Sequence, residues 1–417
     1  MIILARKILP ITSPDIENGA LLIKNKTIEA LGTQKTILKK YPNERVIDLG
    51  ERLIMPGLVN LHAHLELSWL KDVIGEKSDF IEWVMELVEL RKKEAPQVAA
   101  VSAADGLREA IRTGTTCIAD TISRETSLPY LLKSGIRAMV YLEVLGMEEN
   151  RADDILGALQ GRMDALGALP DRIRAGISPH APYSVSAKLF KLLSQYTSTN
   201  TLRLSIHISE TKAESLYLQR KPSPMDEYMK RFGWDALKPN RGRTAVSFIN
   251  KYKMLNNCIA VHSVHVDSRD ISLLKSAGAS VAHCPRSNHY LNAGIAPVGD
   301  MIDAGVNVGI GTDSLASNLD MNMWNEMRFT YLVNRLPARQ IFEMATINGA
   351  KAMGLERITG SLEAGKDADI IAIDTPASAL KNPYQRLLLN TREDDIALTM
   401  VQGKAIYSKD GQTCHEF

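Results

Sequence analysis

The chain has 417 residues, which is too long for one small hydrophobic core but suits a barrel of about 250 residues with a second, smaller domain. Hydrophobic residues make up 45% of the sequence and charged residues 24%, as in an ordinary globular protein. Fifty basic and 48 acidic side chains leave a formal net charge of +2, which argues against nucleic acid as a partner.

The four cysteines stand far apart, at Cys117, Cys258, Cys284 and Cys414. Without a CxxC pair, the sequence predicts neither a disulfide framework nor a thiolate zinc site. No stretch approaches about 18 uninterrupted apolar residues, and residues 1–10 lack the apolar core of a signal peptide. We therefore expect a protein of a reducing compartment, the cytoplasm, with no membrane partner.

Both ends of the chain predict short strands separated by tight turns. Strand-like runs occur at residues 2–4, 20–23 and 46–49, with breakers such as Asn18-Gly19 between them. Near the other end, residues 360–369 lead into strand-like runs at 370–373 and 396–401. We expect residues 1–54 and 360–417 to form one small composite β-sandwich domain.

The middle of the chain, residues 55–359, alternates helices with short apolar strands. The first strand is the run from Leu53 into His62. Seven further strands are expected at residues 114–120, 137–143, 173–178, 204–208, 258–262, 280–283 and 306–313. Eight strands alternating with helices predict an α/β fold, a closed parallel (β/α)8 barrel of the TIM type.

Polar side chains gather where these strands end, which is where barrels of this type carry their active sites. Of the nine histidines, all except His415 lie within a few residues of an expected strand end. Histidines without a shared role would also occur in the middle of helices. The distribution therefore predicts that these side chains converge on one site.

The segment His62-Ala63-His64 closes the first strand and offers half of a metal site. Residues i and i+2 of a strand point to the same face, and neutral imidazole is a common ligand of zinc or iron. A hydrolytic site needs three or four protein ligands and an open position for water. We predict one divalent metal ion, zinc or iron, held by His62, His64, His207 and Asp313. The alternatives are a packing role for His207 and a helix cap at Asp313.

Glu210 follows His207 by three residues and is the candidate general base, because it can reach a water on the metal without binding the metal. Its alternative role is an acidic residue at a helix N-terminus. His262 ends a strand and is expected to hydrogen-bond the water or the developing oxyanion. His265, three residues further on, should face the other side, and His283 fits either the pocket or the core.

In this order, the motifs resemble the amidohydrolase superfamily, and within it the aminohydrolases and triazine-type hydrolases. The matching segments are residues 55–60 leading to His62 and His64, residues 178–183, His207 with Glu210, His262, residues 283–285, residues 311–314 and residues 360–369. The resemblance implies a distorted barrel with the composite domain. It also implies a single metal ion, because the strand before His180 ends without a bridging lysine.

The resemblance further implies hydrolysis of a C–N bond on a heteroaromatic ring. Asp313 and His262 would orient the attacking water. Glu210 would accept its proton and protonate a ring nitrogen, and the tetrahedral centre would lose ammonia. His180 would contact the ring or a ribose.

Two further segments bear on the substrate. Residues 79–83 resemble the segment that closes over the ligand in methylthioadenosine/S-adenosylhomocysteine deaminases, which implies that Glu82 binds ribose hydroxyls; the alternative is the polar face of an amphipathic helix. The strand at 141–144 lacks the arginine by which that subgroup binds an amino-acid carboxylate. Residues 64–68 and 143–146 look more like aminodeoxyfutalosine deaminases. Glu143, Ser287 and Asn288 are additional candidates for substrate contact.

The sequence thus predicts a metal-dependent deaminase that removes the 6-amino group of a 5′-modified adenosine, with a small purine nucleoside as its partner. One alternative is a guanine, cytosine or triazine aminohydrolase or chlorohydrolase, in which Glu82→Ala would barely matter because a free base has no ribose. A second alternative is a non-catalytic relative, against which the complete set of candidate ligands argues. The 5′ substituent, the choice between zinc and iron, and the oligomeric state, including a homodimer, stay open.

Overall fold

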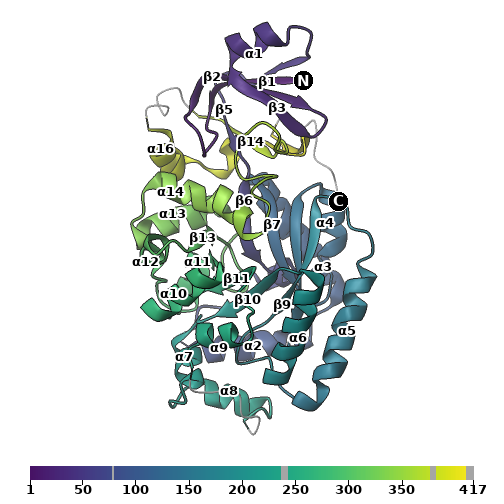
Figure 1. Cartoon of the computed structure of the whole chain (residues 1–417), viewed down its shortest axis with the longest axis vertical. Helices are drawn as coiled ribbons and strands as arrows, with labels where there is room; N and C mark the ends of the chain where they lie inside the picture. The colour runs from purple at the N-terminus through teal and green to yellow at the C-terminus, as the bar shows by residue number, and fades with distance from the viewer. Residues whose placement is uncertain (78, 236–242, 376–381, 410–417) are drawn as a thin grey trace.

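The computed structural model describes residues 1–77, 79–235, 243–375 and 382–409. Strands from both termini form one sheet, drawn at the top of Figure 1, and the middle of the chain forms a barrel below it. Among the described residues, no helix is long and apolar enough to cross a membrane. Cys117, Cys258 and Cys284 are buried and free, and Cys414 lies outside the described residues.

Among the described residues the terminal sheet has eight strands, and it confirms that both ends of the chain build one separate sheet. Its order is β16 (Lys404–Ser408), β15 (Ile396–Val401), β14 (Ile370–Ile373), β5 (Leu53–Pro56), β1 (Ile2–Ile8), β2 (Ile16–Lys24) and β3 (Thr27–Thr33), with β4 (Val46–Asp48) beside β1. The sequence did not predict β3 or β16, because most of their side chains are only half-buried and neither strand has a clear apolar run. Residues 376–381 and 410–417 of the predicted domain lie outside the described residues.

The strand β1 shows why this sheet is covered on both faces. Side chains alternate between the faces of a strand. Ile2 and Leu4 pack on one face with Ile37 of the helix α1 (Gln34–Lys40), whereas Ile3 packs on the other with Ile370 of β14. The second cluster therefore joins strands from the two ends of the chain.

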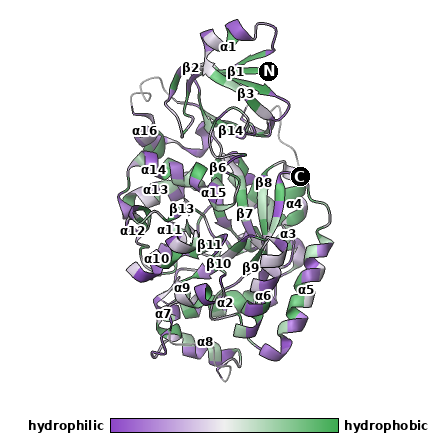
Figure 2. Ribbon diagram, viewed as in Figure 1, coloured by the Kyte–Doolittle hydropathy of each residue, from purple (hydrophilic) through white to green (hydrophobic). Residues whose placement is uncertain are grey.

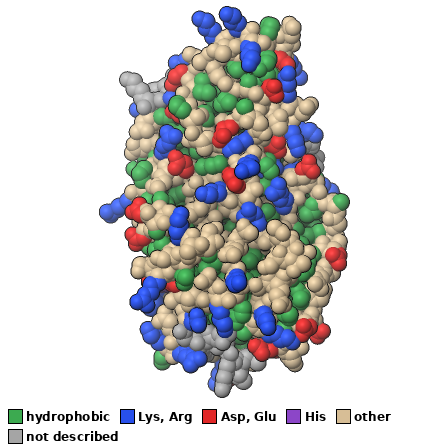
Figure 3. Space-filling model, viewed as in Figure 1, with side chains coloured by type: hydrophobic (Ala, Val, Ile, Leu, Met, Phe, Trp, Pro, Cys, Tyr) green, Lys and Arg blue, Asp and Glu red, His purple; other side chains and the backbone are tan. Residues whose placement is uncertain are grey.

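The barrel contains the eight predicted strands, each parallel to its neighbours, and this fold class is confirmed. Their order is β6 (Leu58–Ala63), β7 (Thr115–Ile122), β8 (Arg137–Val144), β9 (Ile173–Pro179), β10 (Leu204–Ile208), β11 (Cys258–His262), β12 (Ser280–His283) and β13 (Asn307–Ile310). In Figure 2 these strands are mostly hydrophobic, whereas the surrounding helices also carry hydrophilic residues. Basic and acidic side chains are interspersed on the face shown in Figure 3.

Helices surround the barrel and cover its mouth. They are α2 (Phe80–Lys92), α3 (Pro96–Arg112), α4 (Leu128–Ser134), α5 (Ala152–Ala165), α6 (Ala187–Asn200), α7 (Lys212–Leu218), α8 (Met225–Arg231), α9 (Ala245–Lys251), α10 (Ser268–Ala277), α11 (Pro285–Tyr290), α12 (Val298–Asp303), α13 (Met323–Asn334), α14 (Ala338–Glu343), α15 (Gly349–Ala352) and α16 (Pro383–Asn390). A 3-10 helix, η1 (Leu65–Leu70), follows His64 directly. In Figure 1, α2 and α8 lie at the end of the molecule opposite the terminal sheet.

The apolar run before His62 forms two strands rather than the single strand expected. β5 belongs to the terminal sheet and β6 to the barrel, and the chain passes from one to the other at Gly57. A Cβ at Gly57 would lie 2.0 Å from the Thr116 side chain, so only glycine allows this approach of β6 to β7. A run of apolar residues does not reveal such a division, because both strands are buried. The domain boundary at residues 54 and 55 stays a prediction.

The seam between β6 and β13 holds the two ends of the barrel sheet together. Asn60 donates to the Thr312 hydroxyl over 2.8 Å and accepts from the Thr312 backbone over 3.1 Å. The Asp313 backbone N–H donates to the His62 carbonyl over 2.9 Å. A Cβ on Gly311 would lie 2.8 Å from the His62 nitrogen, so the missing side chain lets the strands meet. The contact between β6 and the segment after β13 therefore makes His62 and Asp313 neighbours.

A buried ion-pair network joins the barrel to the terminal sheet. Arg137, at the start of β8, donates from Nε to Asp369 and from Nη2 to Asp367, both over 2.8 Å. Asp369 also accepts from the Gln402 backbone over 2.8 Å. All of the charge on this buried arginine is thus balanced by the C-terminal segment.

Candidate active site

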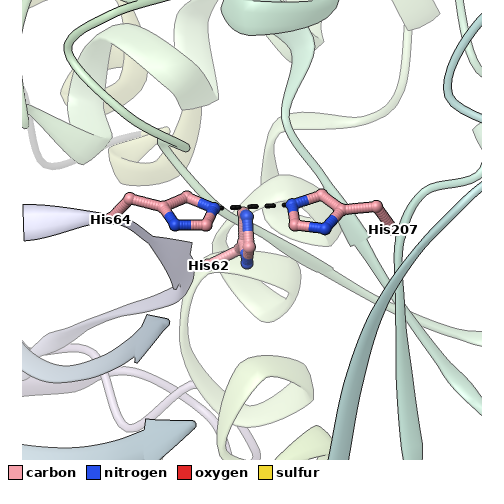
Figure 4. A group of neighbouring side chains, drawn as sticks. All are labelled: His62, His64 and His207. Carbon is pink, nitrogen blue, oxygen red and sulfur yellow. Dashed lines mark hydrogen bonds between the residues drawn. The ribbon is translucent and has the colours of Figure 1, made fainter. Parts of the chain in front are cut away.

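The ends of β6, β10 and β13 bring the four predicted metal ligands together. The candidate ligand nitrogens of His62, His64 and His207 all lie within 4.8 Å of one another. Figure 4 shows the three rings converging, with the Nε2 atoms of His64 and His207 3.4 Å apart. Asp313 Oδ1 lies 3.6 Å from His62 Nε2 and 3.7 Å from His64 Nε2. Residues far apart in the sequence therefore bring three ring nitrogens together, with the Asp313 carboxylate beside two of them.

The protonation states of these groups suit a cation. Burial lowers the pKa of His62 to about 4 and that of His64 to about 3, so both rings are neutral near pH 7. His207 Nδ1 donates to the His180 carbonyl over 3.0 Å, which directs Nε2 toward His64. Burial alone would raise the pKa of Asp313, but its contacts with His62 and the other histidines hold it well below its usual range.

Unpartnered nitrogens in the cluster also support the binding of a metal ion. Both ring nitrogens of His62 are buried and have no hydrogen-bond partner among the described residues. A buried polar atom without a partner costs free energy, and metal coordination is one way to satisfy a ring nitrogen. The donor set of three imidazoles and a carboxylate is the kind that binds zinc or iron at hydrolytic centres.

Asp313 is held so that one oxygen faces the histidines. Its Oδ2 accepts hydrogen bonds from the Ser287 hydroxyl over 2.6 Å and the Ser317 hydroxyl over 3.2 Å. These donors fix the carboxylate and leave Oδ1 directed at His62 and His64. Such support orients a ligand before any ion binds.

Glu210 and His262 lie beside this cluster. His262 Nε2 is 3.6 Å from Glu210 Oε1 and 4.0 Å from Asp313 Oδ2. His262 Nδ1 donates to Asn288 Oδ1 over 2.9 Å, which fixes the ring. Burial raises the pKa of the Glu210 carboxyl to about 7, the range in which a group both accepts and releases a proton near neutrality.

Glu214 shapes the turn that presents Glu210. Its carboxylate accepts from the backbone nitrogens of Ser209 over 3.2 Å and Glu210 over 2.8 Å. Thr211 caps α7 by accepting from the Glu214 nitrogen over 3.1 Å. Glu210 therefore precedes the cap and lies outside the helix, unlike the helix-terminal acid considered as its alternative.

Left-handed backbone conformations occur at three of these strand ends. Ser209, His262 and Asp313 have φ values of 54°, 69° and 61°. Residues other than glycine adopt this region at a cost, and such positions cluster at functional sites. The turns after β10, β11 and β13 therefore direct side chains toward the barrel axis at some expense of stability.

A cavity that opens to solvent adjoins the cluster. One side of its lining comes from the strand ends and their loops: His64, Glu66, Leu67, Thr121, Ser123, Glu143, Leu145, His180, Tyr183, His207, Glu210, His262, Asp313 and Ser314. The other side comes from α2 and α8: Phe80, Trp83, Val84, Leu87, Val88, Arg91 and Tyr228. The cavity is therefore enclosed between the strand ends and two helices.

Two of the predicted substrate contacts face this cavity. Glu143 lines it from the end of β8. His180 lines it after β9, with Nδ1 2.7 Å from the Ser184 hydroxyl. Burial, followed by the charges of His207 and Arg91, holds the pKa of His180 well below its usual value, so the ring is neutral.

Three of the predicted substrate contacts do not face the cavity: Glu82, Ser287 and Asn288. Glu82 is exposed, because it follows Phe80 by two helical positions and falls off the face of α2 that lines the cavity. Ser287 and Asn288 are buried behind the site and bind Asp313 and His262. They position the reacting groups, and none of the three lines the cavity described above.

Sequence reasoning missed several residues of the lining. Arg91 lies eight positions after Trp83 on the same face of α2, and the helical spacing was the available signal. Tyr228 comes from α8, and no motif marks it. His265 donates to the Ala293 carbonyl over 2.8 Å, in keeping with a structural role. His283 does not line this cavity, and its Nε2 lies 3.0 Å from Asn334 Oδ1.

Comparison with known proteins agrees with this architecture. The sequence model of the amidohydrolase family matches residues 53–406. A 5-methylthioadenosine/S-adenosylhomocysteine deaminase of Moorella thermoacetica is 29% identical over 416 residues, covering 96% of this chain and 92% of the relative. The chain belongs to the amidohydrolase family.

Two solved structures share the fold over nearly the whole chain. The aminofutalosine deaminase of Helicobacter pylori, in complex with methylthio-coformycin, has a TM-score of 0.87 at 21% identity and covers 97% of this chain and 100% of its own. An adenosine deaminase of Xanthomonas campestris with bound zinc has a TM-score of 0.83 at 24% identity and covers 97% of this chain and 92% of its own.

Family membership and the relatives define the class of reaction. The protein is an enzyme, a hydrolase that acts on C–N bonds. This excludes the alternative of a non-catalytic barrel.

Proposed function

We propose that this enzyme removes the 6-amino group of a 5′-modified adenosine by hydrolysis, giving the corresponding inosine and ammonia. The observation that carries the proposal is the joint placement of the ligand cluster and Glu210 beside one cavity. The deaminase named among the relatives acts on 5-methylthioadenosine and S-adenosylhomocysteine, which supports a nucleoside with an altered 5′ position.

We also propose that the reaction depends on one divalent cation, zinc or iron. His62, His64, His207 and Asp313 would hold it, and when bound such a cation lowers the pKa of water and stabilises negative charge. The neutral rings and the unpartnered His62 nitrogens support this role. A protein of the same fold contains zinc.

The chain's own residues would carry the proton. Glu210 accepts one proton from the attacking water at its carboxylate and delivers it to a ring nitrogen of the purine. The second proton of the water passes to the amino group, which leaves as ammonia while the C6 oxygen becomes a carbonyl. His262 Nε2 lies within reach of Glu210 and Asp313 and orients the same water. The side chains of α2 line the side of the cavity opposite the strand ends.

The polar groups of the lining suit a nucleoside. His180, Glu143 and Tyr183 face the cavity and offer hydrogen bonds to a purine or a sugar. The apolar side of α2 offers surface to a 5′ substituent. We propose a cytoplasmic location, in keeping with the three free buried cysteines. We also propose a homodimer, which a measurement of the molar mass in solution would test.

The test is a deamination screen with the purified protein after its zinc and iron content has been measured. Adenosine, 5′-deoxyadenosine, methylthioadenosine, S-adenosylhomocysteine and aminodeoxyfutalosine are offered in turn, with guanine and a triazine as alternative substrates. We expect ammonia release and a shift of the adenine absorbance band with at least one nucleoside. Chelation should abolish the activity, and zinc or iron should restore it.

Turnover of guanine or the triazine without turnover of any nucleoside would refute the proposal. Full activity in protein with far less than one metal ion per chain would refute the metal requirement.

A further inference from the structure

A second groove lies between α11 and α13, two helices that contact each other (Figure 1). Its lining includes His283 at the end of β12, Asn288 and His289 of α11, Ile295, and Phe329 and Val333 of α13. Among the described residues, it shares no lining residue with the cavity at the ligand cluster. It is therefore a separate site, on the other side of the helix that supports Asp313 and His262.

The floor of this groove is polar. His283 and Asn288 are each 1% exposed. His283 Nδ1 and Asn288 Nδ2 are buried and have no hydrogen-bond partner within the part of the chain that the structure describes. A buried polar atom without a partner costs about 1–3 kcal/mol. Two such atoms on residues that line one groove indicate a bound group that satisfies both.

Neighbouring hydrogen bonds define what the two atoms offer. Asn334 Nδ2 donates to the Ala296 carbonyl over 3.0 Å, so Asn334 Oδ1 faces His283 Nε2 and accepts its proton over 3.0 Å. Burial lowers the pKa of His283 to about 4, so the ring is neutral near pH 7 and Nδ1 carries a lone pair. Asn288 Oδ1 accepts from His262, which leaves Nδ2 as a donor. The floor thus offers one acceptor and one donor.

The walls of the groove are uncharged and partly apolar. None of the described residues that line it is Asp, Glu, Lys or Arg. Phe329, Val333 and Ile295 supply apolar surface, and the His289 ring centroid lies 5.3 Å from that of Phe329. Such a lining suits a flat, neutral molecule better than an ion.

We propose that this groove binds a neutral, planar heterocycle with a lactam edge, an N–H group beside a carbonyl, as in a pyrimidine base. The N–H would donate to His283 Nδ1, and the carbonyl would accept from Asn288 Nδ2. The site goes beyond the proposed deamination, and its occupancy does not depend on that function.

Asn288 connects the groove to the active site. Its Oδ1 accepts from His262 Nδ1 over 2.9 Å. An acceptor bound at Nδ2 polarises the amide, and hydrogen bonds in a chain strengthen one another. A ligand in the groove would therefore tighten the bond that fixes His262, and it would change kcat from outside the active-site cavity.

Two ligands that differ in their N–H groups test the site: uracil and 1,3-dimethyluracil, which has the same ring and carbonyls. Calorimetry with the wild-type protein should give a Kd for uracil at least about 10-fold lower, because the dimethyl compound leaves His283 Nδ1 without a partner. His283→Phe should remove this preference. Val333→Trp fills the groove and should weaken uracil binding by at least about 10-fold.

Two variants serve as matched controls. Leu332 precedes Val333, is 67% exposed and does not line the groove, so Leu332→Trp should bind uracil as the wild type does. Leu87→Trp narrows the active-site cavity and should also leave the Kd for uracil unchanged. With a nucleoside that the enzyme deaminates, saturating uracil should change kcat in the wild type but not in Val333→Trp.

Several results would overturn the proposal. Absence of uracil binding, or equal Kd values for the two compounds, would mean that the groove holds no lactam. Loss of binding in Leu87→Trp but not in Val333→Trp would place uracil in the active-site cavity. Binding in the groove without any change in kcat would refute the coupling to His262. If no nucleoside is deaminated, the proposed function fails, and the Kd values still decide whether the groove is a binding site.

Discussion

The two sides of the cavity are built in different ways. On the strand side, the backbone or a second side chain holds the reacting groups: Ser287 holds Asp313, Asn288 holds His262 and the His180 carbonyl holds His207. On the α2 side, apolar side chains dominate. The difference indicates that the barrel fixes the chemistry, whereas α2 selects what enters. The predictions below test this division.

The largest effect is expected on the strand side, from Glu210→Gln. The amide cannot accept the proton that the carboxylate takes, so kcat should fall about 10²- to 10⁴-fold. Glu210 lies outside the ligand cluster, so metal content should stay at the wild-type level. The measurement pairs steady-state kinetics with metal analysis, and loss of metal from this variant would mean that Glu210 is itself a ligand.

A smaller effect is expected from Ser287→Ala, which removes the 2.6 Å hydrogen bond to Asp313 Oδ2. Groups that support a metal ligand typically contribute about 10- to 100-fold in metal affinity or activity. Ser317→Ala is the matched control, since its bond to the same oxygen is 3.2 Å and its loss should matter less. Metal titration with a competing chelator measures the difference. Equal affinity in wild type and Ser287→Ala would contradict the supporting role.

On the α2 side, Trp83→Phe should have a moderate effect. It removes the hydrogen bond to the Ala316 carbonyl, a contribution of about 0.5–1.5 kcal/mol. We expect KM to rise about 2- to 10-fold with kcat nearly unchanged. Trp69→Phe is a suitable control, because Trp69 Nε1 has no hydrogen-bond partner among the described residues. A fall in kcat without a change in KM would show that α2 also acts on the chemical step.

The smallest effect is expected from Glu82→Ala. Its side chain is exposed and off the cavity face, so kcat/KM for a nucleoside should change less than about twofold, as surface substitutions usually do. Kinetics with adenosine provide the check. A large rise in KM would show that Glu82 does bind the ribose and that α2 rotates when substrate binds.

The strand side was accessible from sequence because its signals are local. Period-two strands that end in His62, His207 and Asp313, with the rule that barrel strands end at one rim, were enough to group these residues. The same rule does not tell which polar residue faces the cavity and which lies behind it. Ser287 and Asn288 were therefore expected at the substrate, although they support Asp313 and His262.

The α2 side was not accessible in the same way. The sequence offered an amphipathic helix only as the alternative to ribose binding by Glu82, and the face turned to the cavity depends on contacts such as that of Trp83 with Ala316, far along the chain. Motif resemblance alone therefore favoured Glu82, and helical phase excludes it from the lining. Likewise, the passage of the chain between two sheets at Gly57 depends on the Thr116 side chain opposite.

The buried pairing of Arg137 with Asp367 and Asp369 has a consequence for any attempt to excise the barrel. A fragment ending at residue 359 would leave this guanidinium enclosed without counter-charges. Breaking a buried pair in this way costs about 3–5 kcal/mol, against a total folding stability of about 5–15 kcal/mol for a typical domain. The barrel is therefore not expected to fold stably by itself, and a fragment that contains it should also include the C-terminal strands.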